Sequence, residues 1–313
     1  MPEKRIEIAG LGLATLDIVL RGRPGVGSSG RFAFDDVLLE GGGPVATAMA
    51  AASRLGARTG YIGTAGTDFA GECKLLSLTK YAVDVSHVVR RPGPETQVVM
   101  VWVDAHTGER SFTTLSEMLG DPLRPEELDR DYITRAGYLH LDGCHAEAAF
   151  AAARCMREGR KQVVLDAATT SSSVSERMRK LIPYVDVLIC GSGFAQALTG
   201  CGDVSDACRL AVKLGPQTVV QTEGADGSYT ACPSGEFHTP AFEVDVVDTT
   251  GAGDVFHGAY IVGLLKGWRP EQIAVFASAA AAMACTALGG RAGVGGHPET
   301  LAFCRHRGAN IDG

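Results

Sequence analysis

A short run of small residues and two aspartates, toward the C-terminal part of the chain, has the residue types that phosphoryl chemistry needs. It reads DVVDTTGAGDVFHGAY over residues 245–260. Gly251, Ala252 and Gly253 precede an apolar segment that is predicted to be helical, and their small side chains would leave the first N–H groups of that helix open to an anion. Asp254, placed among these amides, would be kept ionised and could accept a proton from a nearby hydroxyl.

An anion-binding helix N-terminus beside a general base is suited to phosphoryl transfer to an alcohol. The amides would neutralise charge on the transferred group while the carboxylate takes the hydroxyl proton. The alternative is a tight turn in which Asp254 only caps the helix, and the stretch alone favours neither interpretation. It is not a Walker A loop, because no Lys-Ser/Thr pair follows the glycines.

The elements that would position this stretch predict a doubly wound, mostly parallel α/β sheet flanked by helices, in a single domain over residues 1–313. Short apolar runs alternate with helical segments such as AEAAFAAARCMREG, and the runs are RIEIAGLG, TGYIGTAG, AGYLHLDG, KQVVLDA, VDVLICG and QTVVQTEG. Ligands bind outside the carboxyl ends of such strands. Asp142 ends one run and is a candidate for sugar contact or helix capping, whereas Asp166 at the end of another is predicted to support the fold.

Two stretches depart from this alternation and predict a small antiparallel sheet. RFAFDDVLLEGGG, from Arg31, and TQVVMVWVDAHTGERSFTTL, from Thr96, alternate apolar and polar residues, and the second contains the hairpin turn DAHTGER. We expect this sheet to be built from residues 13–40 and 96–116. It would serve either as a lid that excludes water or as an edge extension or dimer surface, and the pattern weighs these equally.

Composition limits the classes of function. The chain has 313 residues, a net charge of −7 and an apolar fraction of 45%, so a large core is expected and neither nucleic acid nor an anionic membrane is an expected partner. Nine cysteines occur singly without a C-x-x-C pair, which predicts a reduced, cytoplasmic protein. No targeting segment is expected, and the longest apolar run, Ala274–Leu288, predicts a buried helix.

Two motifs resemble one known family. DTTGAGDVFHGA closely resembles a signature of the ribokinase-like, or PfkB, family of sugar kinases, and GGPVATAMAAASRLG over Gly42–Gly56 resembles the family's other signature. The order and spacing of TEGADG and of the Gly-rich segment GGRAG also match. The resemblance covers nearly the whole chain and is strongest to the sulfofructose kinase branch, whose members phosphorylate 6-deoxy-6-sulfofructose on its C1 hydroxyl.

The resemblance implies a role for each matching position on the acceptor side. Asp254 would be the base, and the amides of Gly251, Ala252 and Gly253 would form the anion hole. The residues that would contact the sugar are Asp17, Gly42, Gly43 and Thr47, with Arg31 as a partner for a sulfonate.

On the nucleotide side, the resemblance implies that Thr222, Gly224 and Gly227 lie along ATP, with Gly290 near the adenine end. Asp248 and Thr250 would hold a monovalent cation such as K⁺, and Mg²⁺ would accompany the ATP phosphates. The resemblance also implies a small-molecule sugar as substrate and a homodimer formed through the lid.

Several positions differ from the family pattern. Thr47 stands where many relatives have Asn, and Gly191 and Phe194 stand where an Asn-x-x-Glu segment linked to magnesium is expected. Cys144 and His145 occupy the place of a pocket arginine of the sulfofructose kinase branch, and that branch has an Asn near Thr114. Two of the three expected sulfonate contacts are therefore absent or replaced.

These observations predict an ATP-dependent kinase that phosphorylates a primary hydroxyl of a ketohexose or a 6-substituted fructose. Kinases for ribose, a nucleoside or a sugar acid are alternatives, as is a sugar-binding regulator without catalysis. The intact GAGD argues against the regulator, and the replaced Asn-x-x-Glu keeps it open. His257 is predicted to be structural, and Arg110, after the hairpin turn, to be solvated or to reach substrate from the lid.

Overall fold

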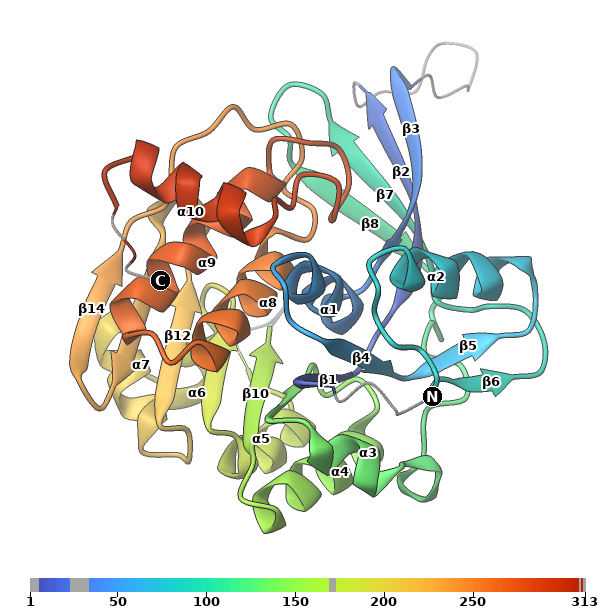
Figure 1. Ribbon diagram of the computed structural model, residues 1–313, viewed down its shortest axis with the longest axis horizontal. Helices are drawn as coiled ribbons and strands as arrows, with labels where there is room; N and C mark the ends of the chain where they lie inside the picture. The colour runs from blue at the N-terminus through green and yellow to red at the C-terminus, as the bar shows by residue number, and fades with distance from the viewer. Residues whose placement is uncertain (1–5, 23–33, 169–172, 310, 312–313) are drawn as a thin grey trace.

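A large mixed sheet forms the centre of the protein. The computed structural model describes residues 6–22, 34–168, 173–309 and 311. Eight strands lie in the order β14-β13-β12-β11-β10-β9-β1-β4. Figure 1 shows the sheet extending from β14 past β12 and β10 to β1 and β4. Every neighbouring pair from β12 to β4 is parallel, and β13 and β14 add an antiparallel edge. This architecture confirms the predicted doubly wound, mostly parallel α/β fold.

The six parallel strands, from β12 to β4, are short and mostly buried on both faces, which explains their continuous apolar sequences, whereas β14 at the antiparallel edge is largely exposed. The bounds of the eight strands are β1 Ile8–Leu11, β4 Thr59–Ile62, β9 Tyr138–Leu141, β10 Gln162–Ala167, β11 Val187–Cys190, β12 Thr218–Thr222, β13 Ser228–Cys232 and β14 Gly235–Thr239.

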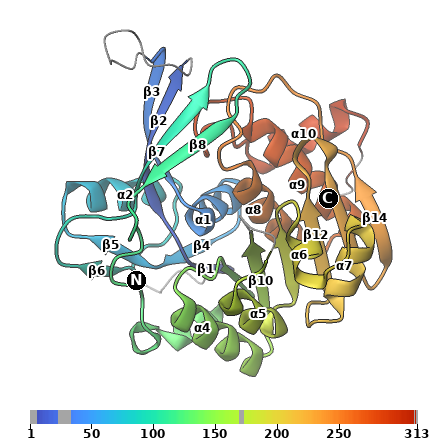
Figure 2. The ribbon, with the colours of Figure 1, turned by 180° about the vertical axis from the view of Figure 1, so that it is seen from behind.

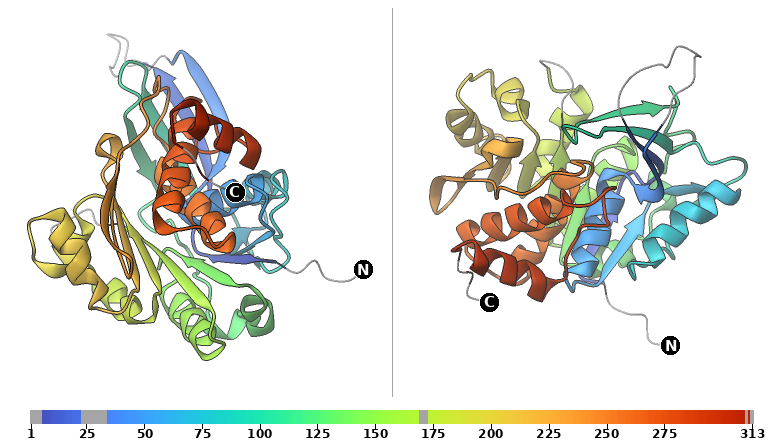
Figure 3. Two further views of the ribbon diagram at one scale, coloured as in Figure 1. Left: turned by 60° about the vertical axis from the view of Figure 1, so that its left-hand side comes forward. Right: turned by 90° about the horizontal axis from the view of Figure 1, so that it is seen from above.

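Helices cover both faces of this sheet, as Figures 2 and 3 show from behind and from two further sides. One layer consists of α1 Pro44–Arg54, α8 Ala252–Leu265, α9 Pro270–Ala284 and α10 His297–His306, and the other of α3 Arg130–Arg135, α4 Ala146–Glu158, α5 Glu176–Leu181, α6 Phe194–Thr199 and α7 Val204–Val212. Alternate residues of a strand face the two layers: Val163 and Leu165 pack with the second layer, and Val164 with the first. No helix within the described ranges is long and apolar enough to cross a membrane.

The predicted buried helix Ala274–Leu288 is α9, but its bounds differ. It begins earlier, at Pro270, and ends at Ala284. The chain leaves the helix there because the carbonyl of Cys285 accepts the N–H groups of Val247, at 2.8 Å, and Asp248, at 3.3 Å. The end of α9 is thereby fixed to the segment that leads into α8.

A second, four-stranded sheet stands apart from the body (Figure 1). Its order is β3-β2-β7-β8, with β2 Thr15–Gly22, β3 Asp36–Gly42, β7 Val98–Asp104 and β8 Arg110–Thr114. The two outer pairs are antiparallel, but β2 and β7 are parallel. The expectation of a purely antiparallel sheet was therefore wrong, because β2 and β7 both run outward from the body while β3 and β8 are the returning arms of two hairpins.

The start of the β7–β8 hairpin is fastened to the body by a buried ion pair. Nζ of Lys74, on α2 Phe69–Thr79, lies 2.6 Å from the carboxylate of Glu95. The same ammonium group donates to the carbonyl of Thr64 on β5 Thr64–Gly66 and to the side chain of Gln97, each at 3.0 Å. All three donors of the lysine are thereby used, which makes a buried charge tolerable.

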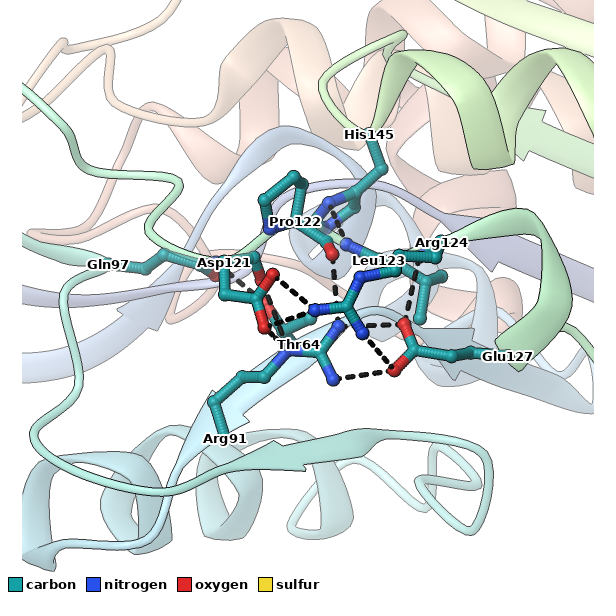
Figure 4. A network of polar contacts seen from close by, with 9 residues as sticks. All are labelled: Thr64, Arg91, Gln97, Asp121, Pro122, Leu123, Arg124, Glu127 and His145. Atoms are coloured by element: carbon teal, nitrogen blue, oxygen red, sulfur yellow. Dashed lines mark hydrogen bonds and ion pairs between the residues drawn. The ribbon is translucent and has the colours of Figure 1, made fainter.

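The segment that follows β8 is fastened by a second network, which Figure 4 shows. Arg91, on β6 Val89–Arg91, donates two hydrogen bonds of 2.7 Å to the carboxylate of Glu127, which ends the short 3₁₀ helix η1 Pro125–Glu127. These hydrogen bonds lower the pKa of Glu127 to about 2. In the same segment the N–H of Leu123 donates to Nδ1 of His145. Both ends of the hairpin are thus tied to the body by charged or polar contacts.

Candidate active site

The N-terminus of α8 is built around a glycine that no other residue could replace without strain. Gly251 is the N-cap, with φ of 70°. A Cβ added at Gly251 would lie 2.9 Å from Cα of Gly290, closer than real Cβ atoms approach. The two loops therefore pack backbone against backbone, and this contact fixes the direction in which the first turn of α8 points.

The amides of this turn are open, as an anion site requires. The N–H of Ala252 donates weakly, at 3.4 Å, to the carbonyl of Thr249, and that of Val255 donates to Gly251 at 2.9 Å. Within the described part of the chain, the N–H groups of Gly253 and Asp254 have no acceptor. Gly253 is exposed, and a Cβ added to it would meet nothing within 4 Å. An anion can therefore approach these amides at the positive end of the helix dipole.

The carboxylate of Asp254 is half-buried in the first turn of α8. Burial raises its pKa to about 7, the charges of Arg110 and Arg291 lower it, and those of Asp17 and Asp142 raise it. The expectation that the helix amides keep this carboxylate ionised is therefore wrong near neutral pH, because burial outweighs the charges of the two arginines. A carboxylate that titrates near neutral pH is nevertheless matched to a general base, because it is partly ionised and holds a proton strongly once it accepts one.

Asp17 and Gly42 meet where the lid sheet joins the body. Asp17 lies on β2, is 7% exposed and accepts a hydrogen bond from the hydroxyl of Thr15. A Cβ added to Gly42, on β3, would lie 2.0 Å from Oδ2 of Asp17, so only glycine leaves this carboxylate in place. Gly43 follows as the N-cap of α1. Three of the predicted sugar-contacting residues are therefore brought together.

Thr47, the fourth of these residues, is held by an arginine that the sequence reasoning missed. The side chain of Arg291 is 1% exposed. It donates to the hydroxyl of Thr47 at 3.2 Å, to the carbonyl of Gly42 at 2.9 Å and to the hydroxyl of Ser77 at 3.2 Å. The only signal in the sequence was the segment GGRAG, of which Gly290 alone was assigned a role. Arg31, the predicted partner of a sulfonate, lies outside the described residues.

Asp142, which ends β9, faces the same region but is already engaged. Its two carboxylate oxygens accept the N–H groups of Leu13, at 2.7 Å, and Cys144, at 2.8 Å. Burial raises its pKa. The residue therefore fixes the turn after β1 and the turn after β9. It does not cap the next helix, because the N-cap of α4 is His145 and α4 has no side-chain cap hydrogen bond. Burial also raises the pKa of the Cys144 thiol well above its usual range, which makes that thiol a poor nucleophile.

The lid contacts the segment that leads into α8. Arg110, on β8, donates a hydrogen bond of 2.7 Å to the hydroxyl of Thr249. The N–H and the hydroxyl of Thr249 lie 3.3 Å and 3.2 Å from the carbonyl oxygen of Gly108 in the hairpin turn. Arg110 is exposed to solvent, as one of its two predicted placements has it, and its charge also acts on Asp254.

The residues predicted for ATP occupy two places. Thr222 ends β12, and Gly224 and Gly227 lie at the start of η3 Gly224–Asp226 and just after it. Gly290 is instead against Gly251, beside the anion hole. At the positions of the family's Asn-x-x-Glu segment, Gly191 has no side chain, and Phe194 is fully buried in the core. Neither position offers a side-chain oxygen to a metal ion.

Asp248 and Thr250 form a compact buried group beside the anion hole. Oδ1 of Asp248 accepts the N–H of Thr250, and Oδ2 accepts that of Gly289, each at 2.8 Å. The hydroxyl oxygen of Thr250 is buried and has no hydrogen-bond partner among the described residues. A buried hydroxyl without a partner next to a fully buried carboxylate fits the oxygen ligands that an alkali cation needs.

An open helix N-terminus at the carboxyl edge of a parallel sheet, beside a carboxylate that titrates near neutral pH, defines an enzyme that transfers an anionic group to an alcohol. The comparisons with known proteins make the class specific. The family model "pfkB family carbohydrate kinase" matches residues 30–294, and the chain belongs to this family. The predicted enzyme class is confirmed: the protein is a sugar or nucleoside kinase.

Individual relatives agree with this class. The chain is 32% identical to aminoimidazole riboside kinase of Salmonella typhimurium, over 79% of this chain and 82% of the relative. It is 29% identical to fructokinase of Klebsiella pneumoniae, over 79% of this chain and 84% of that protein. The fold is shared with an E. coli candidate ribokinase II in complex with ATP and Mg²⁺, at a TM-score of 0.83 and 19% identity, covering 96% of this chain and 99% of that one.

Proposed function

We propose that the protein transfers the γ-phosphoryl group of ATP to a primary hydroxyl of a ketohexose or a 6-substituted fructose. The single observation that carries this proposal is the pair of open N–H groups of Gly253 and Asp254 beside the side-chain carboxylate of Asp254. This carboxylate is close enough to Asp17 for the two charges to interact. Family membership supports ATP with Mg²⁺ as the phosphoryl donor.

The reaction follows from the chain's own groups. Asp254 takes the proton of the sugar hydroxyl while the hydroxyl oxygen forms a bond to the γ-phosphorus and the bond between that phosphorus and the ADP oxygen breaks. The open amides of the α8 N-terminus stabilise the negative charge on the transferred group. Asp17 orients the sugar by accepting hydrogen bonds from its other hydroxyls, and Arg110 brings a positive charge from the lid to the same place.

Two metal ions are part of the proposal. Asp248 and Thr250 would hold K⁺ next to the anion hole, because the buried hydroxyl of Thr250 lacks any other partner among the described residues. Mg²⁺ would neutralise charge on the ATP phosphates, and its ligands would be mainly phosphate oxygens and water, since Gly191 and Phe194 have no side-chain oxygen. Activity that does not change when K⁺ is replaced by tetramethylammonium would contradict the first assignment.

The natural acceptor is tested with purified full-length protein, ATP, Mg²⁺ and a panel of sugars, by measuring ADP release. The panel includes fructose, 6-deoxy-6-sulfofructose with its C1 hydroxyl as acceptor, ribose, a nucleoside such as aminoimidazole riboside, and a 2-keto-3-deoxy sugar acid. Highest kcat/KM with a ketohexose supports the proposal. Highest kcat/KM with ribose, the nucleoside or the acid assigns the protein to one of the alternative kinases.

The alternative from another class is a sugar-binding regulator without catalysis, and the replaced Asn-x-x-Glu positions are the observation that favours it. Sugar binding in calorimetry without ADP release for any sugar on the panel would establish that alternative. ADP release with any sugar excludes it.

We also propose that two copies associate through the lid. Four large apolar side chains of this sheet and its margin are more than half exposed: Val37 at 65%, Leu39 at 55%, Phe112 at 55% and Leu115 at 56%. Several large apolar side chains exposed on one small sheet are typical of an interaction surface. Light scattering should show a dimer, and Val37→Lys with Phe112→Lys should give a monomer. A wild-type monomer at micromolar concentration would contradict this.

A further inference from the structure

Two buried histidines and one aspartate converge between β9, β10 and α8. His140 on β9 is fully buried, His257 on α8 is 4% exposed, and Asp166 near the end of β10 is half-buried. One possible ligand atom from each residue lies within 4.8 Å of the others. Nε2 of His257 is 3.7 Å from Oδ1 of Asp166, and the two imidazole rings are 5.3 Å apart between their centres.

The convergence follows from strand geometry. His140 is paired in register with Val164 on β10, so Asp166, two residues further along, points to the same face of the sheet. That face is covered by the layer that contains α8, because Val164 packs in the core formed with it. His257 lies on α8 one turn after Asp254 and joins His140 and Asp166 from the helix layer that covers this face.

Ordinary hydrogen bonding does not account for these histidines. Among the described residues, both ring nitrogens of His140 and Nδ1 of His257 are buried without a hydrogen-bond partner. Such unpaired polar atoms are costly in a core. Burial lowers the pKa of His140 to about 4 and that of His257 well below its usual value, so both rings are neutral at pH 7. A neutral imidazole has a lone pair to give to a metal ion.

We propose that His140, Asp166 and His257 form a binding site for one divalent transition-metal ion, with Zn²⁺ as the first candidate. Two imidazole nitrogens and one carboxylate oxygen are ligands that suit Zn²⁺, whereas Mg²⁺ and Ca²⁺ take oxygen ligands. Bonds of about 2.0–2.2 Å place ligand atoms roughly 3.5 Å apart, so the three groups need only small movements inward. Burial and the neighbouring carboxylates of Asp254 and Asp142 raise the pKa of Asp166 well above its usual value, so binding of the ion would release a proton from this group. Water would be the fourth ligand.

This site is additional to the metal ions of the proposed kinase reaction and does not depend on that reaction. Its test uses the full chain after removal of metals by a chelator. Zn²⁺ uptake is measured by elemental analysis after gel filtration, and Co²⁺ binding by visible absorption. We expect one equivalent of metal, the strong d–d bands of four-coordinate Co²⁺, and no displacement by millimolar Mg²⁺. Absence of uptake would overturn the proposal.

The nine cysteines are all unpaired and could bind the same metals, so the ligands must be identified. His140→Gln and His257→Gln should each weaken Co²⁺ binding at least about 100-fold. His297→Gln is the matched control, because His297 on α10 also has a buried ring nitrogen without a partner among the described residues but lies outside the cluster. The His297→Gln variant should bind Co²⁺ with the same affinity as the wild type.

If either cluster variant fails to fold, imidazole ¹⁵N shifts of wild-type protein replace it. Zn²⁺ should then shift the signals of His140 and His257 at one equivalent. A sulfur-to-cobalt charge-transfer band without these shifts, or unchanged Co²⁺ affinity in folded His140 and His257 variants, would show that the ion binds elsewhere and that the proposal is wrong.

Discussion

The turnover of this enzyme should rise about tenfold between pH 6 and pH 8 because of one carboxylate. In the proposed reaction Asp254 must be ionised to accept the proton of the sugar hydroxyl, and burial raises its pKa to about 7. A group with that pKa is ~9% ionised at pH 6 and ~91% ionised at pH 8, which gives the tenfold ratio. The sign is fixed by the role, since a base loses activity as the pH falls through its pKa.

Asp254→Asn removes the base but leaves the backbone amides of the first turn of α8. The variant should therefore bind ATP as the wild type does and lose roughly 10²- to 10⁴-fold in kcat. Its remaining turnover should not change between pH 6 and pH 8. Asp245→Asn, which removes the same charge at an exposed position of the preceding loop, is the matched control and should behave as the wild type.

The assay is steady-state ADP release at saturating ATP and sugar from pH 5.5 to pH 8.5, with calorimetry for ATP affinity. Near-normal turnover of Asp254→Asn would refute the assignment of the base. The assignment would also be refuted if kcat of Asp254→Asn fell at acidic pH with the same midpoint as in the wild type, because another group would then be the base whose titration limits kcat. A wild-type profile that is flat across this range would refute the account of the pKa.

Three further changes test other parts of the site and of the lid. Gly42→Ala places a Cβ 2.0 Å from Oδ2 of Asp17, so the KM for the sugar should rise at least about tenfold while that for ATP stays constant, and equal effects on both would argue for misfolding instead. Arg110→Gln removes a charge that lowers the pKa of Asp254, so the acidic midpoint of kcat should move to higher pH, by about half a unit for a partly screened pair; a shift to lower pH would contradict the geometry. Glu127→Gln should lower the free energy of unfolding in urea by about 1–2 kcal/mol at pH 7. The folded pKa of Glu127 is about 2, below that of an unfolded glutamate, so its contribution is present above pH ~4.3 and disappears as the pH falls toward 2; a difference that persists at pH 2 would contradict this.

Much of the fold could be predicted from local patterns. Apolar runs ending in small or acidic residues gave the parallel strands, and the turn DAHTGER gave the β7–β8 hairpin. The antiparallel edge formed by β13 and β14 was not predicted, because its strands are short and β14 is largely exposed. The parallel pairing of β2 with β7 could not be read either, since strands so far apart in the chain have no local signal of direction.

The candidate active site was likewise predicted only in part. GAGD could be interpreted from the chemistry of a helix N-terminus, and Asp17, Gly42 and Thr47 from the family resemblance. The arginine that holds Thr47 is 244 positions away in sequence, and Arg110 is 139 positions from Thr249. Contacts at such separation are created only by the tertiary fold. The convergence of His140 and His257 was likewise invisible, because each looks like an ordinary core residue in its own segment.

The position of Asp17 has a consequence for how the enzyme would select its substrate. Asp17 belongs to a strand of the outer sheet, whereas Thr47 belongs to a helix of the body, so a sugar held by both bridges two parts of the molecule. Arg291 already holds Thr47 and Gly42 together, and Gly42 lies against Asp17, so the two parts meet before any sugar is present. An acceptor with several hydroxyls could bond to both Asp17 and Thr47, whereas a single water molecule offers too few groups to do so, and this difference would favour the sugar over water as acceptor.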